Sequence, residues 1–114
     1  AGGDVPVVTR ADARPTLQSE WSKARIEIVG GGNQHGRLEA MLVTLEAGGS
    51  SGKRPEASTR EEFTLVLDGS LELTLDDGQQ MLEAGDAVTI LRGAARRWHN
   101  PGDQVARILI VAGR

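Results

Sequence analysis

The sequence lacks cysteine altogether, which excludes a disulfide-bonded scaffold and a thiolate zinc site. It also lacks any long apolar run, because the longest ones, such as residues 108–112, extend over only a few positions, and this excludes a membrane-spanning helix. The N-terminus has no basic-then-apolar signal peptide layout. We therefore expect a soluble, cytoplasmic protein with no membrane partner.

An excess of positive charge is absent as well. Thirteen Lys and Arg residues stand against sixteen Asp and Glu residues, for a net charge of −3, so the chain offers no electrostatic footprint for nucleic acid. Its 114 residues, 39% hydrophobic and 25% charged, are typical of a single globular domain. The chain opens at Ala1 and not at methionine, which is consistent with an excised piece of a longer protein.

Alternation of apolar and polar residues with a period of two is the main pattern of the sequence, and it predicts β-strands. Runs rich in Val, Ile, Leu and Thr are closed by Gly- and Asp-containing turns, and no 3.6-residue period follows residue 62. The predicted strands cover residues 38–45, 63–67, 71–75, 87–91 and 105–111, with less legible ones at 5–8 and 24–29. This pattern predicts an all-β sandwich or barrel and excludes a βαβ fold.

Three segments stand out from this pattern. The strand over 63–67 is apolar on both faces, so it is either central and covered on both sides or meets a second subunit. The polar stretch 47–60 is expected to be a long loop, functional or mobile. The glycine-rich stretch 30–36 is expected to be a simple connector, because no strand-turn-helix context surrounds it.

The chain has too few histidines for a histidine-based metal centre. The chain has two histidines, His35 in the glycine connector and His99 before a turn, far apart in sequence. Metal sites need convergent imidazoles and carboxylates. Arg92 and Arg97, near Trp98, are expected to be solvated surface charges.

Five residues carry a resemblance to a known family. Glu62, Gly69, Gly85, Gly93 and Asn100 stand at the spacing of the two cupin motifs, so the chain resembles a cupin. The resemblance implies a single jelly-roll β-barrel, the double-stranded β-helix. We expect N-terminal strands and a connector in residues 1–36 and the cupin core in residues 37–112.

A closer likeness covers nearly the whole chain. Residues 37–43, 50–52, 61–63, 66–69 and 97–103 resemble the C-terminal cupin half of bacterial regulators that carry an N-terminal lambda-repressor-like (XRE-type) helix-turn-helix. The resemblance implies a sensor domain that dimerises and reaches DNA only through a DNA-binding domain outside this chain.

The family's metal positions are altered in this sequence. In cupins the side chains at positions 58, 62 and 96 hold a divalent metal, but here they are Ser58, Glu62 and Arg96. A guanidinium cannot deprotonate and is repelled by a cation. We therefore expect no metal ligand and no cofactor. A buried Glu62 would then need a partner, and we expect a two-bond ion pair with Arg96 in the metal's place.

Strand alternation extends this ion pair into a pocket. Arg96 and Trp98 must share one face, and so must Glu62 and Thr64. A carboxylate, a guanidinium and an aromatic wall suit a small ligand. The alternative is a filled core that admits none. The expected pocket residues are Glu62, Arg96, Trp98, Thr64 and Ser58, with Met41 and Val43 as further lining.

Three functional hypotheses follow. We favour a small-molecule effector-binding, homodimeric domain of a bacterial transcription regulator, which is not an enzyme and has no catalytic residue. The second is a cupin enzyme, a metal-independent isomerase or a dioxygenase, although Glu62 is the sole inward candidate base and His99 is expected to face outward. The third is a stand-alone binding or assembly module. The sequence does not identify the effector.

Overall fold

The computed structural model describes residues 6–31 and 36–113. These residues form an all-β domain in which the one helical element is a three-residue 3-10 turn, η2 (Ala11–Ala13). The strands are β1 (Thr16–Ser19), β2 (Ala24–Gly30), β3 (Leu38–Leu45), β4 (Glu56–Ala57), β5 (Glu62–Asp68), β6 (Ser70–Leu75), β7 (Gly78–Glu83), β8 (Ala87–Ile90), β9 (Ala95–His99) and β10 (Ala106–Gly113).

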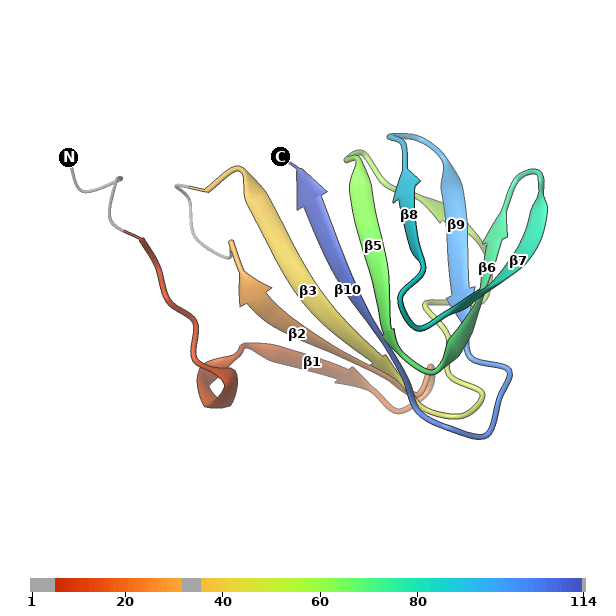
Figure 1. Ribbon diagram of the computed structural model, residues 1–114, viewed down its shortest axis with the longest axis horizontal. Helices are drawn as coiled ribbons and strands as arrows, with labels where there is room; N and C mark the ends of the chain where they lie inside the picture. The colour runs from red at the N-terminus through yellow and green to blue at the C-terminus, as the bar shows by residue number, and fades with distance from the viewer. Residues whose placement is uncertain (1–5, 32–35, 114) are drawn as a thin grey trace.

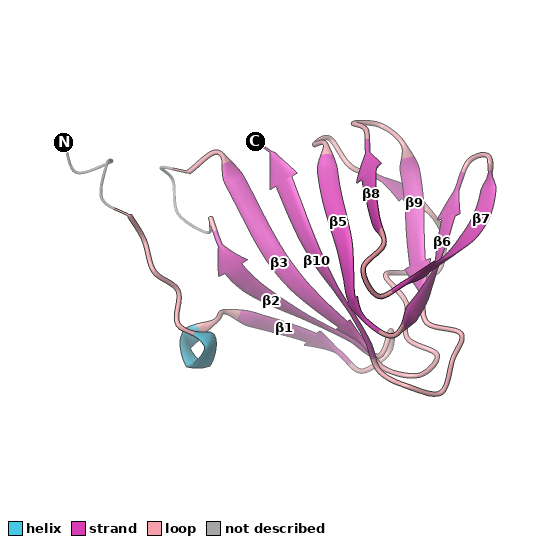
Figure 2. Ribbon diagram, in the orientation of Figure 1, coloured by secondary structure: helices cyan, strands magenta, loops and turns pink. Residues whose placement is uncertain are grey.

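Two antiparallel sheets build the domain. One has six strands in the order β1-β2-β3-β10-β5-β8, and the other has four in the order β4-β9-β6-β7. Figure 1 shows the four-stranded sheet at one end of the molecule, with β3, β2 and β1 of the larger sheet extending away from it. Strands and loops make up nearly all of the ribbon (Figure 2). The predicted all-β architecture is confirmed.

The core lies between the two sheets and follows from strand alternation. Along β10, Ala106, Ile108, Ile110 and Ala112 are buried and alternate with more accessible residues. They pack with Val43 and Leu45 of β3, Val66 of β5, Leu71 and Leu73 of β6, Ile90 of β8 and Trp98 of β9. Complete burial of a large apolar side chain contributes about 1.5–3 kcal/mol, so this cluster holds the two sheets together.

The turns explain two positions that the sequence singled out. Gly69 joins β5 to β6 with φ +75, and a Cβ there would lie 2.9 Å from the Val105 carbonyl oxygen. Asn100 is 1% exposed, and its Nδ2 donates to the carbonyl oxygens of Leu45 (3.0 Å) and Gln104 (2.7 Å). Asn100 thereby ties the end of β9 to the end of β3.

Several predicted strands match the structure, and one does not. The strands predicted at 24–29, 38–45, 63–67, 71–75, 87–91 and 105–111 correspond to β2, β3, β5, β6, β8 and β10. The strand predicted at 5–8 is wrong for residues 6–8, which make no strand, since Pro6 has no N–H and no neighbouring strand pairs with the segment. Residue 5 lies outside the described residues.

The polar stretch 47–60 is more ordered than a simple loop. It contains β4, whose Glu56 and Ala57 pair with Arg96 and Ala95 of β9. Ser51 N–H also donates to the Trp98 carbonyl oxygen (2.9 Å). This segment therefore brings its side chains against β9. Over the described residues, no helix has the length and apolar character needed to cross a membrane.

Candidate functional site

A cavity of about 300 Å³ lies between the six-stranded sheet and the β4–β9 pair. Its apolar side comes from β1, β2, β3 and β10, and its polar side from β5, β9 and the segment that holds β4. The lining residues are Leu17, Gln18, Ser19, Ser22, Ala24, Ile26, Met41, Val43, Ser50, Ser51, Arg54, Glu56, Glu62, Arg96, Trp98, Ile108 and Ile110.

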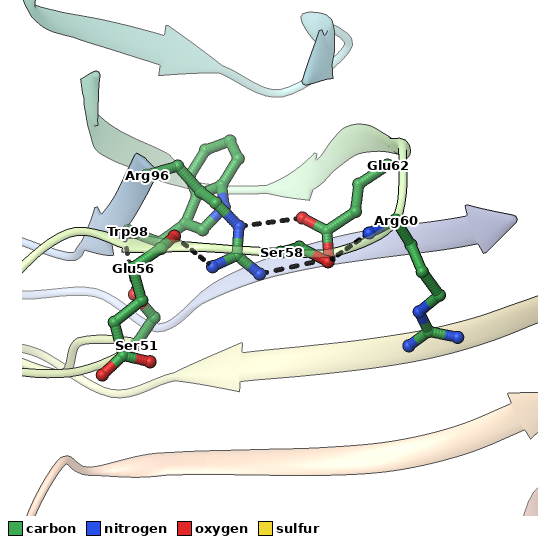
Figure 3. Close-up of polar contacts among 7 residues, drawn as sticks. All are labelled: Ser51, Glu56, Ser58, Arg60, Glu62, Arg96 and Trp98. Atoms are coloured by element: carbon green, nitrogen blue, oxygen red, sulfur yellow. Dashed lines mark hydrogen bonds and ion pairs between the residues drawn. The ribbon is translucent and has the colours of Figure 1, made fainter. Parts of the chain in front are cut away.

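The polar side is organised by a two-bond ion pair. Arg96 Nε donates to Glu62 Oε1 at 2.8 Å, and Arg96 Nη2 donates to Glu62 Oε2 at 3.1 Å (Figure 3). The side chains are 22% and 4% exposed, respectively. The expected Arg96–Glu62 pair is confirmed, and its fork geometry is the strong form of a charge-assisted interaction.

The pair joins the two sheets. Glu62 opens β5 in the six-stranded sheet, whereas Arg96 lies on β9 in the four-stranded sheet. A nearly buried carboxylate stays charged at low cost only when its oxygens are satisfied, and Arg96 occupies both of them. The pair therefore fixes both side chains at the cavity wall.

A second carboxylate, which sequence reasoning missed, lines the same cavity. The backbone carbonyl oxygen of Glu56 accepts a bond from Arg96 Nη1 at 2.8 Å (Figure 3). The Glu56 residue itself is exposed and lines the cavity together with Arg54. Two sequence signals pointed to it: the length of the polar stretch 47–60, and the place of Glu56 in the first cupin motif, two residues before Ser58. Arg96 thus holds the Glu62 carboxylate with one side of its fork and the Glu56 backbone with the other.

Trp98 brings an unpaired donor to the site. The residue is 3% exposed, and its indole Nε1 has no hydrogen-bond partner in the part of the chain that the structure describes. Its backbone N–H donates to Ser51 Oγ at 2.9 Å, which fixes the residue against the 47–60 segment (Figure 3). A buried donor without an acceptor costs about 1–3 kcal/mol, so an acceptor on a ligand would offset this cost.

Of the remaining predicted pocket residues, two line the cavity and two do not. Met41 and Val43 lie on its apolar side. Thr64 shares the inward face of β5 but is 1% exposed and lies outside the cavity lining, where it is the cross-strand neighbour of Ile110. Ser58 also lies outside the lining, since its Oγ accepts a bond from the Arg60 N–H at 3.1 Å in a local turn (Figure 3). Ligand binding by all seven residues stays a prediction.

The residues at the family's metal positions do not fit a divalent cation. Ser58 Oγ accepts a bond in its own turn, each oxygen of Glu62 accepts a bond from Arg96, and the permanent positive charge of Arg96 repels a cation at this position. The described residues contain no group of three or more His, Cys, Asp or Glu side chains that could hold a metal. His99 Nδ1 lies 3.6 Å from Glu72 Oε1, and His35 lies outside the described residues.

The fold agrees with comparisons to known proteins. The family model described as "Cupin domain" matches residues 41–112, and the chain belongs to the cupin family. The chain is 36% identical over 108 residues to the "Beta-D-galactosidase Rv1717" of Mycobacterium tuberculosis, covering 90% of each chain.

Two solved structures share the fold. A sugar phosphate isomerase of the cupin superfamily from Silicibacter pomeroyi aligns with a TM-score of 0.79 at 23% identity, covering 96% of this chain and 76% of that one. The cupin domain of an XRE family transcriptional regulator from Enterobacter cloacae aligns with a TM-score of 0.71 at 14% identity, covering 81% of this chain and 97% of that one. The predicted single-domain cupin barrel is confirmed.

One functional expectation is corrected. The sequence led us to expect that the protein is not an enzyme. This expectation is wrong, because a relative that is 36% identical over 90% of both chains is named for an enzymatic activity. The error came from equating loss of the metal ligands with loss of chemistry. Glu56 and Glu62 both line the cavity, and carboxyl groups can carry out acid–base chemistry without a metal.

Proposed function

We propose that this protein is a cupin enzyme that hydrolyses a glycoside in the cavity between its sheets, with carboxylates in place of a metal. One observation carries the proposal: Glu56 and Glu62 line the same cavity and are both held by Arg96, one through its backbone and the other through its carboxylate. The name of the Mycobacterium tuberculosis relative, a β-D-galactosidase, supports a galactoside as the first substrate to test.

The lining of the cavity suits a sugar ring. Ile26, Met41 and Val43 offer an apolar surface for the ring's C–H groups. On the polar side, Arg54 and the unpaired indole N–H of Trp98 can donate to hydroxyl oxygens. A mainly apolar cavity with a few convergent polar groups is the usual form of a small-molecule site.

The two carboxylates differ in a way that assigns their roles. Each oxygen of Glu62 accepts one bond from Arg96 and keeps a second lone pair, so in the proposal Glu62 is an oriented anion that accepts a proton from the attacking water. The Glu56 carboxyl group forms no ion pair within the described residues, which leaves it as the second acid–base group of the cavity; in the proposal it donates a proton to the leaving-group oxygen. The bond between the anomeric carbon and that oxygen breaks as the bond from water forms.

Hydrolysis of p-nitrophenyl β-D-galactopyranoside tests this function. Glu56→Gln and Glu62→Gln should each lower kcat by about 100-fold or more. Glu83→Gln, an exposed carboxylate on β7 outside the cavity lining, is the matched control and should leave kcat unchanged. Because the donor set does not fit a divalent cation, dialysis against EDTA should leave activity unchanged. A wild-type protein without hydrolytic activity, or a Glu56→Gln variant with full activity, would contradict the proposal.

A second candidate function rests on the match to the regulator's cupin domain, which covers 97% of that domain. In this case the cavity binds a small-molecule effector, and the chain is the homodimeric sensor of a cytoplasmic regulator that reaches DNA through a helix-turn-helix outside this sequence. Saturable binding of a small molecule without turnover, together with a helix-turn-helix encoded directly before Ala1, would favour this function over hydrolysis.

A further inference from the structure

A second groove, with a volume of about 430 Å³, is built partly by the outer face of the six-stranded sheet. It shares Gln18, Ser19 and Ala24 with the cavity that contains Glu62 but differs from it in chemistry, since it contains three cationic side chains and its surface is mainly polar. The residues that line it are Gln18, Ser19, Glu20, Lys23, Ala24, Arg25, Thr44, Glu46, Val105 and Arg107.

A row of cross-strand neighbours forms the part of this groove that lies on the sheet. Arg25 of β2 pairs with Thr44 of β3, and Thr44 pairs on its other side with Arg107 of β10. Directly opposed residues in antiparallel strands point to the same face with Cβ atoms about 4.5–5.5 Å apart, so the two arginines stand about 10 Å apart with Thr44 between them. The adjacent core residues Val43 and Leu45 face inward, which places this row on the outer face.

The polar atoms of this row are short of partners. Thr44 is 9% exposed, and its Oγ1 has no hydrogen-bond partner among the described residues. Arg25 Nε makes no hydrogen bond with the described residues, although it forms an ion pair with Glu27 Oε1 at 3.6 Å. The Arg107 guanidinium forms no ion pair with the described residues, although Asp68 is its cross-strand neighbour. The Thr44 hydroxyl and the two arginines of this row thus lie side by side on the sheet, and each guanidinium group has donors beyond the contacts described.

We propose that this groove binds the phosphate group of a small molecule, with one oxygen on Thr44 Oγ1 and the others on the guanidinium groups of Arg25 and Arg107. Guanidinium forks match phosphate oxygens in pairs, which a point charge cannot do. Lys23, from the β1–β2 turn, adds a third positive charge. Glu20 and Glu46, from the turns that flank the strands, also line the groove, so its lining has three cations and two carboxylates; outside the lining, Glu27 pairs with Arg25 and Asp68 is the cross-strand neighbour of Arg107.

Titration with inorganic phosphate at constant ionic strength, followed by calorimetry and by the melting temperature, tests the site. The full chain should bind phosphate saturably and melt at a higher temperature in its presence. Arg107→Met should weaken binding by about tenfold or more, because it removes charge-assisted hydrogen bonds. Arg92→Met makes the same change in net charge at an exposed position outside the groove and should leave the affinity unchanged.

Thr44→Val separates a binding role from a structural one. Since the Thr44 hydroxyl has no partner to lose, the variant should unfold at the same denaturant concentration as the wild type or a higher one, yet bind phosphate at least about threefold more weakly. The absence of saturable phosphate binding by the wild type, or equal weakening by Arg92→Met and Arg107→Met, would overturn the proposal. Neither result bears on hydrolysis in the other cavity.

Discussion

Glu62 and Arg96 connect the two sheets of the domain through a pair of hydrogen bonds of 2.8 and 3.1 Å. Both residues line the cavity, so the contact that closes this part of the barrel also orients a carboxylate within it. Arg96 occupies a family metal position, and as a permanent cation it excludes a divalent ion there while it satisfies the carboxylate that would otherwise have held one.

Neutralising this carboxylate should destabilise the fold. Glu62→Gln leaves Arg96, whose side chain is 22% exposed, without its anionic partner, and we expect the free energy of unfolding to fall by about 3 kcal/mol. Urea denaturation measures this change. Glu61→Gln, an adjacent exposed carboxylate, should change it by less than about 0.5 kcal/mol. Equal effects of the two variants would contradict a stabilising role for the ion pair.

Asn100 should be a second determinant of stability. Asn100→Ala removes the donor that satisfies the carbonyl oxygens of Leu45 and Gln104, so we expect a loss of about 2–4 kcal/mol in thermal or urea unfolding. Gln79→Ala is the control, because it removes an exposed side-chain bond to Thr74 (3.3 Å) and should cost less than about 0.5 kcal/mol. A loss at Asn100 no larger than at Gln79 would show that the buried bonds do not support the β9–β10 turn.

The features that could be predicted from the sequence are those set by local alternation and by the cost of burying charge. The alternation of β9 predicted that Arg96 and Trp98 share one face, and the need of a buried Glu62 for a partner predicted Arg96. By contrast, β7 is largely polar and exposed, and its pairing with β6 gives it strand structure that its own residues do not signal.

Alternation could not predict which of the inward-facing residues of a strand border the cavity. A period of two places Glu62 and Thr64 on one face, but it does not tell which of them borders a cavity and which is packed beneath it. Thr64 is buried outside the cavity lining. Ser58 also lies outside it, because its Oγ accepts a hydrogen bond from the Arg60 N–H in a local turn. The approach of Glu56 to Arg96 depends on how the 47–60 segment folds across β9, which no local pattern encodes.

Trp98 offers a test of ligand contact that is distinct from packing. Trp98→Phe removes the indole N–H, which has no partner among the described residues, and the smaller ring should lower the free energy of unfolding by only about 1–2 kcal/mol. If the N–H donates to a substrate hydroxyl, KM for the galactoside should rise about fivefold or more while kcat changes little. Trp21→Phe, 63% exposed and outside the cavity lining, should change neither. An unchanged KM for Trp98→Phe would remove Trp98 from the binding site.

The outer face of the six-stranded sheet predicts self-association. Phe63 and Leu67 of β5 are 44% and 40% exposed, and Leu65 between them shares this face with Leu109 of β10. An apolar outer face on a central strand is unusual for an antiparallel sheet, which normally presents polar residues to water, so we expect a homodimer through it. Sedimentation equilibrium should give twice the 12.1 kDa chain mass for the wild type and a single chain mass for Phe63→Glu. Met81→Glu, 51% exposed on β7 of the other sheet, is the control and should remain dimeric. A wild-type monomer would contradict the interface, and a Phe63→Glu dimer would place the contact elsewhere on the surface.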